Sequence, residues 1–371
     1  MENRPEALIE EEYKTWRKNV KYMYDLVYTQ TLKWPSPTVQ WFPEVERKSD
    51  ATTSQRILLT TFTDQREQEH VLIGRMGFPD IVDEDEKAGA QINFDIVQSM
   101  PVPAEINKAK YCPISTNLLA CKTEEADVLV YDYTRHASFN SDVAPDERLR
   151  GHSEGGFALD WNKINFGHLV TGGRDKAICH FDINSGLIRK YGHHSEVVNA
   201  VSCSAFNPAV FASVSDDCSL VVVDTRNEEA AVVARKAHAS SIEFVDFSPF
   251  RAELIATASS DKTIRVWDTR NTRSPVAVLR GHKGDVMTVK WSLHYESILA
   301  SGSKDRRINI WDLNKSNAAS GDASNELVFI HGGHANTVAD FDWNPAEPIE
   351  IVSVCDSNFI HVWKIPIEDY I

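Results

Sequence analysis

A histidine, an aspartate and a hydroxyl residue recur together at fixed spacing along this chain, and these are the side-chain types of a Ser–His–Asp catalytic triad. The histidine occurs five times, as His152, His194, His238, His282 and His334. The hydroxyl residue stands nineteen positions after each of them, as Thr171, Ser213, Thr257, Ser301 and Ser353. Twenty-three positions after the first four histidines stand Asp175, Asp217, Asp261 and Asp305, whereas the fifth copy has Ser357.

This repetition favours a structural role for the three side chains over a catalytic one. A catalytic triad occurs once in a domain, whereas this set recurs in copy after copy. Buried polar groups of this kind are tolerated when each has a hydrogen-bond partner. The sequence also contains no phosphate-binding loop, metal-ligand cluster or nucleophile elbow. We therefore expect a protein that is not an enzyme and that uses no metal and no cofactor.

Apolar residues in the same register indicate which elements carry these side chains. Nine positions after the histidines stand Trp161, Cys203, Phe247, Trp291 and Trp343, and twenty-nine after them stand Phe181, Val223, Trp267, Trp311 and Trp363. A degenerate sixth copy starts at Val102, and apolar runs at 38–42, 56–62 and 70–76 predict strands of a seventh. Each copy has the pattern of four short strands separated by turns. Because one such sheet cannot bury both faces, the copies must stack and close radially.

Two dipeptides resemble the signature of the WD-repeat β-propeller family. They are Gly-His at 151–152, 281–282 and 333–334, and Trp-Asp at 267–268 and 311–312. The resemblance covers residues 36–365 and implies an all-β, seven-bladed WD-repeat β-propeller. It also implies that the histidine, hydroxyl residue, aspartate and tryptophan of a copy form a structural hydrogen-bond network. Two copies carry all four members: His238, Thr257, Asp261 and Trp267, and His282, Ser301, Asp305 and Trp311.

The composition limits the partners and the compartment. The chain has 371 residues with 39 Lys and Arg against 54 Asp and Glu, so its net charge of −15 argues against direct DNA binding and favours basic partners. Its six cysteines include no C-x-x-C pair, which fits a reducing compartment. The N-terminus is too charged for a secretory signal, and no apolar run reaches the roughly 18 residues of a membrane helix. We expect an intracellular protein that makes no membrane contact.

Three segments depart from the repeat. Residues 6–28 predict an amphipathic helix whose apolar stripe consists of Ile9, Tyr13, Trp16, Val20, Met23 and Val27. We expect residues 1–30 to form an N-terminal helical segment that packs on a propeller formed by residues 31–371. Tyr22 and Leu26 lie about 100–140° away from the stripe, either by chance or as half of a partner groove. The acidic insertion 78–89 and the small, polar segment 314–326 predict surface loops.

These segments resemble one family of WD-repeat proteins. The stretches EEYKTWRKN, YDLV, TLKWPSPTVQWFPEV, FIHGGH and DFDWNP are similar to those of the histone-binding, retinoblastoma-associated proteins that include the small subunit of chromatin assembly factor. The resemblance implies a non-catalytic scaffold, monomeric by itself, that binds histones within chromatin assembly, remodelling, deacetylase or Polycomb-type complexes. It also implies residence in the nucleus, with the cytoplasm as a second compartment.

The same resemblance implies a groove for the first helix of histone four. Its matching residues are Tyr22, Met23 and Leu26 on the N-terminal helix and Asp322 and Glu326 on the loop before the last blade. The family has several acidic residues and a Pro-Pro pair in that loop, whereas this chain has Ala323-Ser324-Asn325. Fewer charges predict weaker capture of basic histone side chains at this groove.

A second predicted site is the mouth of the central channel. The residues three and five positions after each repeat histidine should surround this mouth. They include Glu105, Asn107, Phe157, Asn199, Glu243, Asp285 and Met287, and Glu154 should lie nearby. Converging carboxylates attract Arg or Lys, and the resemblance implies that the mouth takes the histone-three tail; the alternative is a set of ordinary solvated charges. The resemblance adds Asp356 and His70 at the rim. Gly155, Asn199 and Lys33 replace acidic residues that the family has, which predicts a different tail preference.

Two other functions compete with histone binding. The segments 224–226 and 267–270 resemble the WD-x-R motif of substrate receptors of cullin-RING ubiquitin ligases, although one copy lacks the tryptophan. The simpler interpretation is that each arginine caps the end of a strand. A ribosome-assembly propeller is the third hypothesis, and the N-terminal helix argues against it.

Overall fold

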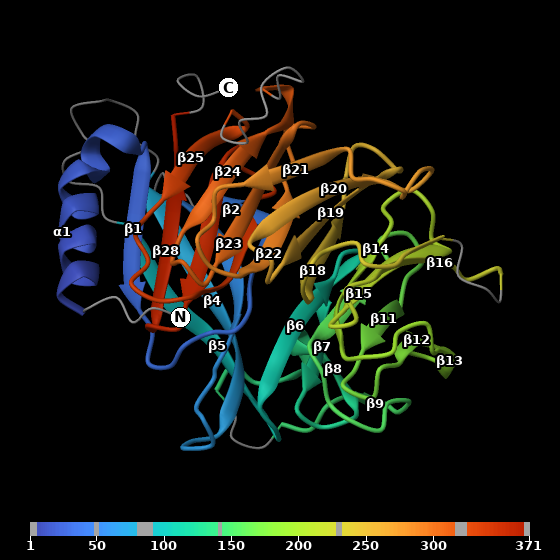
Figure 1. Cartoon of the computed structure of the whole chain (residues 1–371). Helices are drawn as coiled ribbons and strands as arrows, with labels where there is room; N and C mark the ends of the chain where they lie inside the picture. The colour runs from blue at the N-terminus through green and yellow to red at the C-terminus, as the bar shows by residue number, and fades with distance from the viewer. Residues whose placement is uncertain are drawn as a thin grey trace.

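The computed structural model describes residues 6–47, 52–79, 92–139, 143–227, 232–315 and 325–366, and it contains seven four-stranded antiparallel sheets (Figure 1). The prediction of an all-β, seven-bladed propeller with an N-terminal helix is confirmed. Most of the predicted loops 78–89 and 314–326 lie outside the described residues, although Phe78 and Pro79 belong to a strand. None of the described helices combines the length and hydrophobicity that crossing a bilayer requires.

Each sheet consists of four strands that are consecutive in the chain, except for the last. Named from the channel outward, the first three sheets are β2 (Val39–Arg47), β3 (Thr52–Thr60), β4 (Glu69–Pro79) and β5 (Asn93–Val102); β6 (Ile106–Cys112), β7 (Ser115–Thr123), β8 (Val128–Asp132) and β9 (Glu147–Leu149); and β10 (Ala158–Trp161), β11 (His168–Gly172), β12 (Ile178–Asp182) and β13 (Gly186–Tyr191). The next three are β14 (Val198–Cys203), β15 (Val210–Ser215), β16 (Leu220–Asp224) and β17 (Val232–Ala234); β18 (Ile242–Phe247), β19 (Leu254–Ser259), β20 (Thr263–Asp268) and β21 (Ala277–Arg280); and β22 (Val286–Trp291), β23 (Ile298–Ser303), β24 (Ile308–Asp312) and β25 (Leu327–His331). Short 3₁₀ turns follow β8 (η2, Tyr133–Arg135) and β24 (η3, Leu313–Lys315).

The last sheet joins the two ends of the chain. It contains β26 (Val338–Trp343), β27 (Glu350–Cys355) and β28 (Phe359–Lys364), and its outer strand is β1 (Leu26–Thr31). The β1–β28 pairing runs antiparallel from Leu26 opposite Lys364 to Thr31 opposite Phe359. The innermost strand of this sheet, β26, contacts β2 and β22, so the first and last sheets are neighbours.

The predicted helix is shorter than its apolar stripe suggested. The helix α1 spans Glu6–Met23, and the prediction that it continues to residue 28 is wrong. The Tyr24 amide makes the last helical hydrogen bond, to the Val20 carbonyl, and the Asp25 amide already donates to Lys364 of β28. Residues 26–30, which the sequence pattern places in the helical segment, therefore form part of the propeller. Pairing with β28 satisfies the backbone of this segment and overrides the helical periodicity.

Tryptophans at the nine-residue position join neighbouring sheets. Trp161, Trp291 and Trp343 end three innermost strands and are fully buried. Their indole N–H groups donate to backbone carbonyls of the adjacent innermost strand: Trp161 to Lys110, Trp291 to Asp246 and Trp343 to Lys290, at 2.9, 3.3 and 3.2 Å. The middle strands between them are almost entirely buried, because each lies between two neighbouring sheets. The repeated tryptophans thus fix the spacing of the blades and the shape of the channel.

The helix α1 lies against the last sheet beside β1 and β28, as Figure 1 shows. Trp16, Val20 and Met23 pack on the hydrophobic core of that sheet. The Glu12 carboxylate lies 2.8 Å from Arg306 and 3.0 Å from Arg307, which follow β23. Apolar packing and ion pairing together set the position of α1.

Candidate functional sites

The repeated polar residues bond to one another within their own blade. His238 Nδ1 lies 3.0 Å from Asp261, and His238 Nε2 lies 2.8 Å from the Thr257 hydroxyl, which also accepts a 2.9 Å hydrogen bond from Trp267. In the next blade His282 makes contacts of 3.0 and 2.8 Å to Asp305 and Ser301, and Trp311 donates to Ser301 at 2.8 Å. The histidine, hydroxyl and tryptophan side chains of both sets are buried. Such groups hold a loop against a strand and do not face a substrate cavity.

The charge state of this network follows from its hydrogen bonds. Burial by itself would raise the pKa of Asp261, but hydrogen bonds from His238, Thr263 and the Ala239 amide outweigh burial and hold that pKa below its usual value. Burial lowers the pKa of His238 more than Asp261 raises it. At neutral pH the network therefore pairs a carboxylate with a neutral imidazole.

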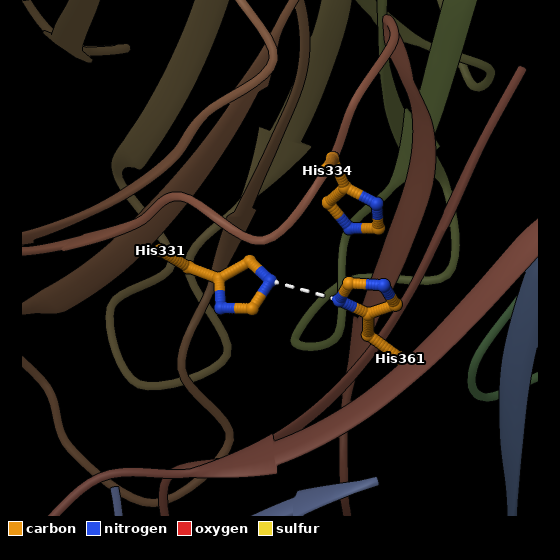
Figure 2. Close-up of side chains that lie close together, drawn as sticks. All are labelled: His331, His334 and His361. Carbon is orange, nitrogen blue, oxygen red and sulfur yellow. Dashed lines mark hydrogen bonds between the residues drawn. The ribbon is translucent and has the colours of Figure 1, made fainter. Parts of the chain in front are cut away.

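The last blade lacks the aspartate, and its His334 and His361 cluster with His331, which ends β25 of the preceding blade (Figure 2). His334 Nε2 lies 2.8 Å from Ser353, but its Nδ1 has no hydrogen-bond partner among the described residues. His331 Nε2 lies 3.3 Å from His361 Nδ1, and nitrogens of all three rings lie within 4.8 Å of one another. All three side chains are buried, and burial lowers the pKa of His361 to about 3.

Neutral imidazoles are common ligands of zinc and copper. Among the described residues, this cluster is therefore the candidate for a metal site. The His334 and His361 rings, however, lie face to face at 4.3 Å with 21° between their planes. Their in-plane lone pairs run side by side instead of converging. His331 Nδ1 lies 2.9 Å from the Tyr24 hydroxyl, which accepts a 3.0 Å hydrogen bond from Trp16 of α1. These contacts make the cluster an anchor for α1.

The predicted channel mouth is a cavity of about 790 Å³. Seven of the ten predicted residues line it: Glu105, Asn107, Phe157, Asn199, Glu243, Met287 and Asp356. Glu154, Asp285 and His70 do not contribute to its lining, although Asp285 pairs at 2.9 Å with Lys304, which does. His70 packs locally, with its ring 2.9 Å from the Gln68 carbonyl.

The sequence analysis missed a second ring of residues at the mouth. Each stands twenty-two positions after the repeat histidine, or after Val102 in the degenerate copy, and directly precedes the position of the turn aspartate. Four of them line the cavity: Glu124, Arg174, Lys304 and Asp356, of which only Asp356 was predicted. These turn residues bond to the predicted inner-strand residues of the same blade. Asn107 donates to Glu124 at 2.9 Å, Asn199 donates to Asp216 at 2.7 Å, and Ser260 donates to Glu243 at 2.6 Å. The fixed offset of twenty-two was the signal that would have found them.

The electrostatics of the mouth are mixed and not uniformly acidic. Its lining contains four acidic residues, Glu105, Glu124, Glu243 and Asp356, and four basic ones, Lys108, Lys110, Arg174 and Lys304. Lys108 and Lys110 are paired deeper in the channel with Asp340 and Asp160, at 2.7 and 2.8 Å. Arg174 pairs with Glu124 and lies over the Phe157 ring at 5.1 Å.

Three carboxylates of the mouth have no ion pair within the described part of the chain: Glu105, Glu243 and Asp356. Burial and the neighbouring Glu124 raise the pKa of Glu105, and burial raises the pKa of Asp356. Arg174 near Glu105 and Lys304 near Asp356 offset these rises in pKa only in part. A cation entering the cavity would lower both pKa values, so the mouth favours a basic ligand.

Four of the five residues of the predicted histone-helix groove belong to the described part of the chain, and their surroundings differ. Tyr22 is 74% exposed, whereas its neighbour Met23 packs on the last sheet. Leu26 lies in β1 instead of on the helix, because β1 pairs with β28. Glu326 is buried, with its carbonyl accepting a hydrogen bond from Asp312, and Asp322 lies outside the described residues. Of the four predicted residues that the structure describes, Tyr22 is the most exposed.

The arginines of the WD-x-R-like segments turn back on their own chain. Arg226 lies 2.5 Å from Asp224, and Arg270 lies 2.6 Å from Asp268. These contacts match the interpretation of arginines that cap a strand end.

Seven repeated sheets, a buried histidine network and a ligand-sized cavity at one end of the channel define a WD-repeat β-propeller of the binding type. The family model for the histone-binding protein RBBP4 and its counterpart in the CAF1 complex matches residues 11–80, and the WD domain, G-beta repeat model matches 231–268 and 273–312. The first match covers most of α1, β1 and the strands β2, β3 and β4 of the first blade.

Similar proteins span the whole chain. A protein of Encephalitozoon cuniculi is 49% identical over 97% of both chains. Proteins of Aspergillus oryzae and Neurospora crassa are each 42% identical over 97% of this chain, and over 91% and 89% of their own lengths. All three are named histone acetyltransferase type B subunit 2. The chain belongs to this histone-binding WD-repeat family, which confirms the resemblance seen in the sequence.

Proposed function

We propose that this chain is the non-catalytic, histone-binding subunit of a type B histone acetyltransferase and that it acts in the nucleus. The single observation that carries the proposal is the cavity at the channel mouth, with three carboxylates that lack an ion pair. The names of the relatives favour this complex over the chromatin assembly, remodelling, deacetylase and Polycomb-type complexes, which stay predictions. The repeated His, Asp and hydroxyl residues serve the scaffold.

The chemistry of the mouth suits an arginine or lysine from a histone-three tail. Glu105, Glu243 and Asp356 accept hydrogen bonds from its cationic head, and charge-assisted bonds of this kind are the stronger ones. Phe157 and Met287 pack against its aliphatic stem. Arg174 already lies over Phe157 in this way, which supports the same geometry for an arginine of the tail.

The outer face of α1 is the proposed second contact, for the first helix of histone four. Tyr22 is the exposed aromatic residue there, and Lys21 lies 4.7 Å above its ring. An amphipathic partner helix buries such a residue readily. The chain supplies few acidic partners at this place, so we expect weaker binding here than at the mouth.

Two reciprocal substitutions test these contacts by isothermal titration calorimetry at moderate salt. Glu243→Gln removes a charge but keeps the shape, so it should weaken binding of a histone-three N-terminal peptide about tenfold, which corresponds to about 1.4 kcal/mol. Tyr22→Asp should weaken binding of a histone-four first-helix peptide and leave the histone-three peptide unaffected. The structure favours Tyr22 over Leu26 as the target, because a change in β1 would disturb the last blade.

The matched control for the charge change is Glu296→Gln, an exposed acidic residue in the turn after β22, at the other end of the channel. It should leave both affinities within twofold of the unsubstituted chain. If neither peptide binds the unsubstituted chain, histone binding at these places is refuted. If the purified adaptor of a cullin-RING ligase binds instead, the ubiquitin-ligase hypothesis replaces it.

A further inference from the structure

Five consecutive blades expose a large apolar side chain at the same place, the turn between their first and second strands. These residues are Ile114, Ile164, Phe166, Phe206, Phe250 and Leu293, here called the apolar ring. Each is between 40% and 48% exposed. Single exposed apolar residues are ordinary on a protein surface, but a set repeated around one end of a propeller is not.

The apolar ring lies at the end of the channel opposite the mouth. Its turns follow the carboxyl ends of the innermost strands, whereas the mouth is lined by the residues that begin those strands. A recess of about 200 Å³ lies between the turns, and Pro113, Pro249, Leu293 and Pro345 form part of its lining. These residues add apolar surface between the ring and the channel axis, whereas the rest of the lining includes four lysines and four aspartates, whose charges balance.

The turns hold the ring residues in a fixed geometry. In three of them a side chain at the start of the turn accepts a hydrogen bond from the amide of the ring residue two positions later. Asn162 accepts from Ile164 at 3.0 Å, Ser204 from Phe206 at 3.2 Å, and Ser248 from Phe250 at 3.2 Å. Such turns are rigid, so little order is lost when a partner covers them.

The charged residues of the neighbouring turns and strand ends are largely paired with one another. Arg251 lies 2.7 Å from Glu253, Arg270 lies 2.6 Å from Asp268, and Lys364 lies 3.2 Å from Glu347. This end of the channel therefore offers an apolar surface with balanced charge, in a chain whose net charge is −15. The complementary partner is an apolar protein surface with little net charge, unlike a histone tail.

We propose that the apolar ring is the docking surface for the catalytic subunit of the complex, which presents an apolar, nearly uncharged face to it. This inference rests on the proposed function, because a relative named subunit 2 implies a second subunit. A second copy of this chain is the less suitable occupant, since each copy brings a charge of −15 to the contact. The ring and the mouth lie at opposite ends of the channel, so the subunit and a histone tail bind at the same time.

The test measures binding of the purified catalytic subunit of the type B acetyltransferase from the same species by surface plasmon resonance. The triple variant Ile164→Ser, Phe206→Ser, Phe250→Ser should bind this subunit at least thirtyfold more weakly than the unsubstituted chain. Its affinity for the histone-three tail peptide should stay within twofold. An unchanged melting temperature shows that the exposed substitutions leave the fold intact.

The matched control variant is Leu187→Ser, Ile188→Ser, Val233→Ser, which removes three apolar residues of similar exposure from the outer strands β13 and β17. It should bind both the catalytic subunit and the peptide as the unsubstituted chain does. The inference is overturned if the unsubstituted chain does not bind the subunit, if the ring variant binds it within twofold, or if the control variant loses as much affinity as the ring variant. Loss of histone-peptide binding by the unsubstituted chain would refute the proposed function and not the docking surface.

Discussion

Single side chains in this propeller act as members of short hydrogen-bonded sets. The Thr257 hydroxyl bridges His238 and Trp267, and Ser301 does the same for His282 and Trp311. A buried donor or acceptor that loses its partner costs about 1–3 kcal/mol, so each bridging hydroxyl stabilises two other side chains. This dependence explains why the hydroxyl residue recurs in every copy that has the histidine.

Thr257→Val tests the bridging role at the residue scale. Valine has nearly the shape of threonine but leaves His238 Nε2 and Trp267 Nε1 buried without a partner, so the unfolding free energy should fall by about 3 kcal/mol. Denaturant titration followed by tryptophan fluorescence measures the change. Thr15→Val, on the exposed surface of α1, is the control and should change stability by less than about 0.5 kcal/mol. Equal effects of the two substitutions would contradict the bridging role.

At the scale of elements, α1 is connected to the last blade through a buried aromatic and imidazole cluster. Trp16 stacks on His361 at 5.8 Å and donates to the Tyr24 hydroxyl, which lies against His331. Burial keeps the pKa of all three histidines, His331, His334 and His361, well below the usual value, so they are neutral at physiological pH. Protonation in acid would place charge inside the contact that positions α1.

The pH dependence of stability follows from the sign of these shifts. The pKa of His361 is about 3 in the folded chain and near 6.5 when it is unfolded, so the unfolded state takes up the proton first and stability falls as the pH drops below about 6.5. One such histidine contributes a slope of about 1.4 kcal/mol per pH unit. His361→Gln should make the decline between pH 6.5 and 4.5 shallower by about that amount, as measured by denaturant titration at several pH values. An unchanged slope in His361→Gln would contradict the assignment.

For the whole molecule, the β1–β28 pairing joins the start of the chain to its last blade. Six residue pairs make this contact, and α1 packs over the same sheet. Without β1, the edge of β28 would present unpaired backbone groups to other chains. The closed ring also fixes the innermost strands, whose two ends form the mouth and the recess inside the apolar ring.

Removal of residues 1–31 tests this closure. The shortened chain should melt about 10 °C lower than the full chain and should aggregate at lower temperature, because the last blade loses its outer strand and the packing of α1. Differential scanning fluorimetry with light scattering measures both quantities. Removal of residues 1–5 alone, which precede α1, is the control. A melting temperature that matches the control would show that the ring does not need β1.

Fixed spacing in the sequence predicted the number of blades, the members of the histidine network and six of the residues that line the channel mouth, and the family resemblance added Asp356. These features depend on local chain geometry that each copy repeats, so residue type and offset are sufficient to predict them. Tertiary structure decided the features that depend on contacts between distant segments. Val27 continues the apolar stripe of α1 yet lies in β1 opposite Trp363, because pairing with β28 satisfies its backbone. Likewise, only the folded ring brings Arg174 next to Glu124 of the preceding blade, and only there do the turns of five blades form one apolar surface.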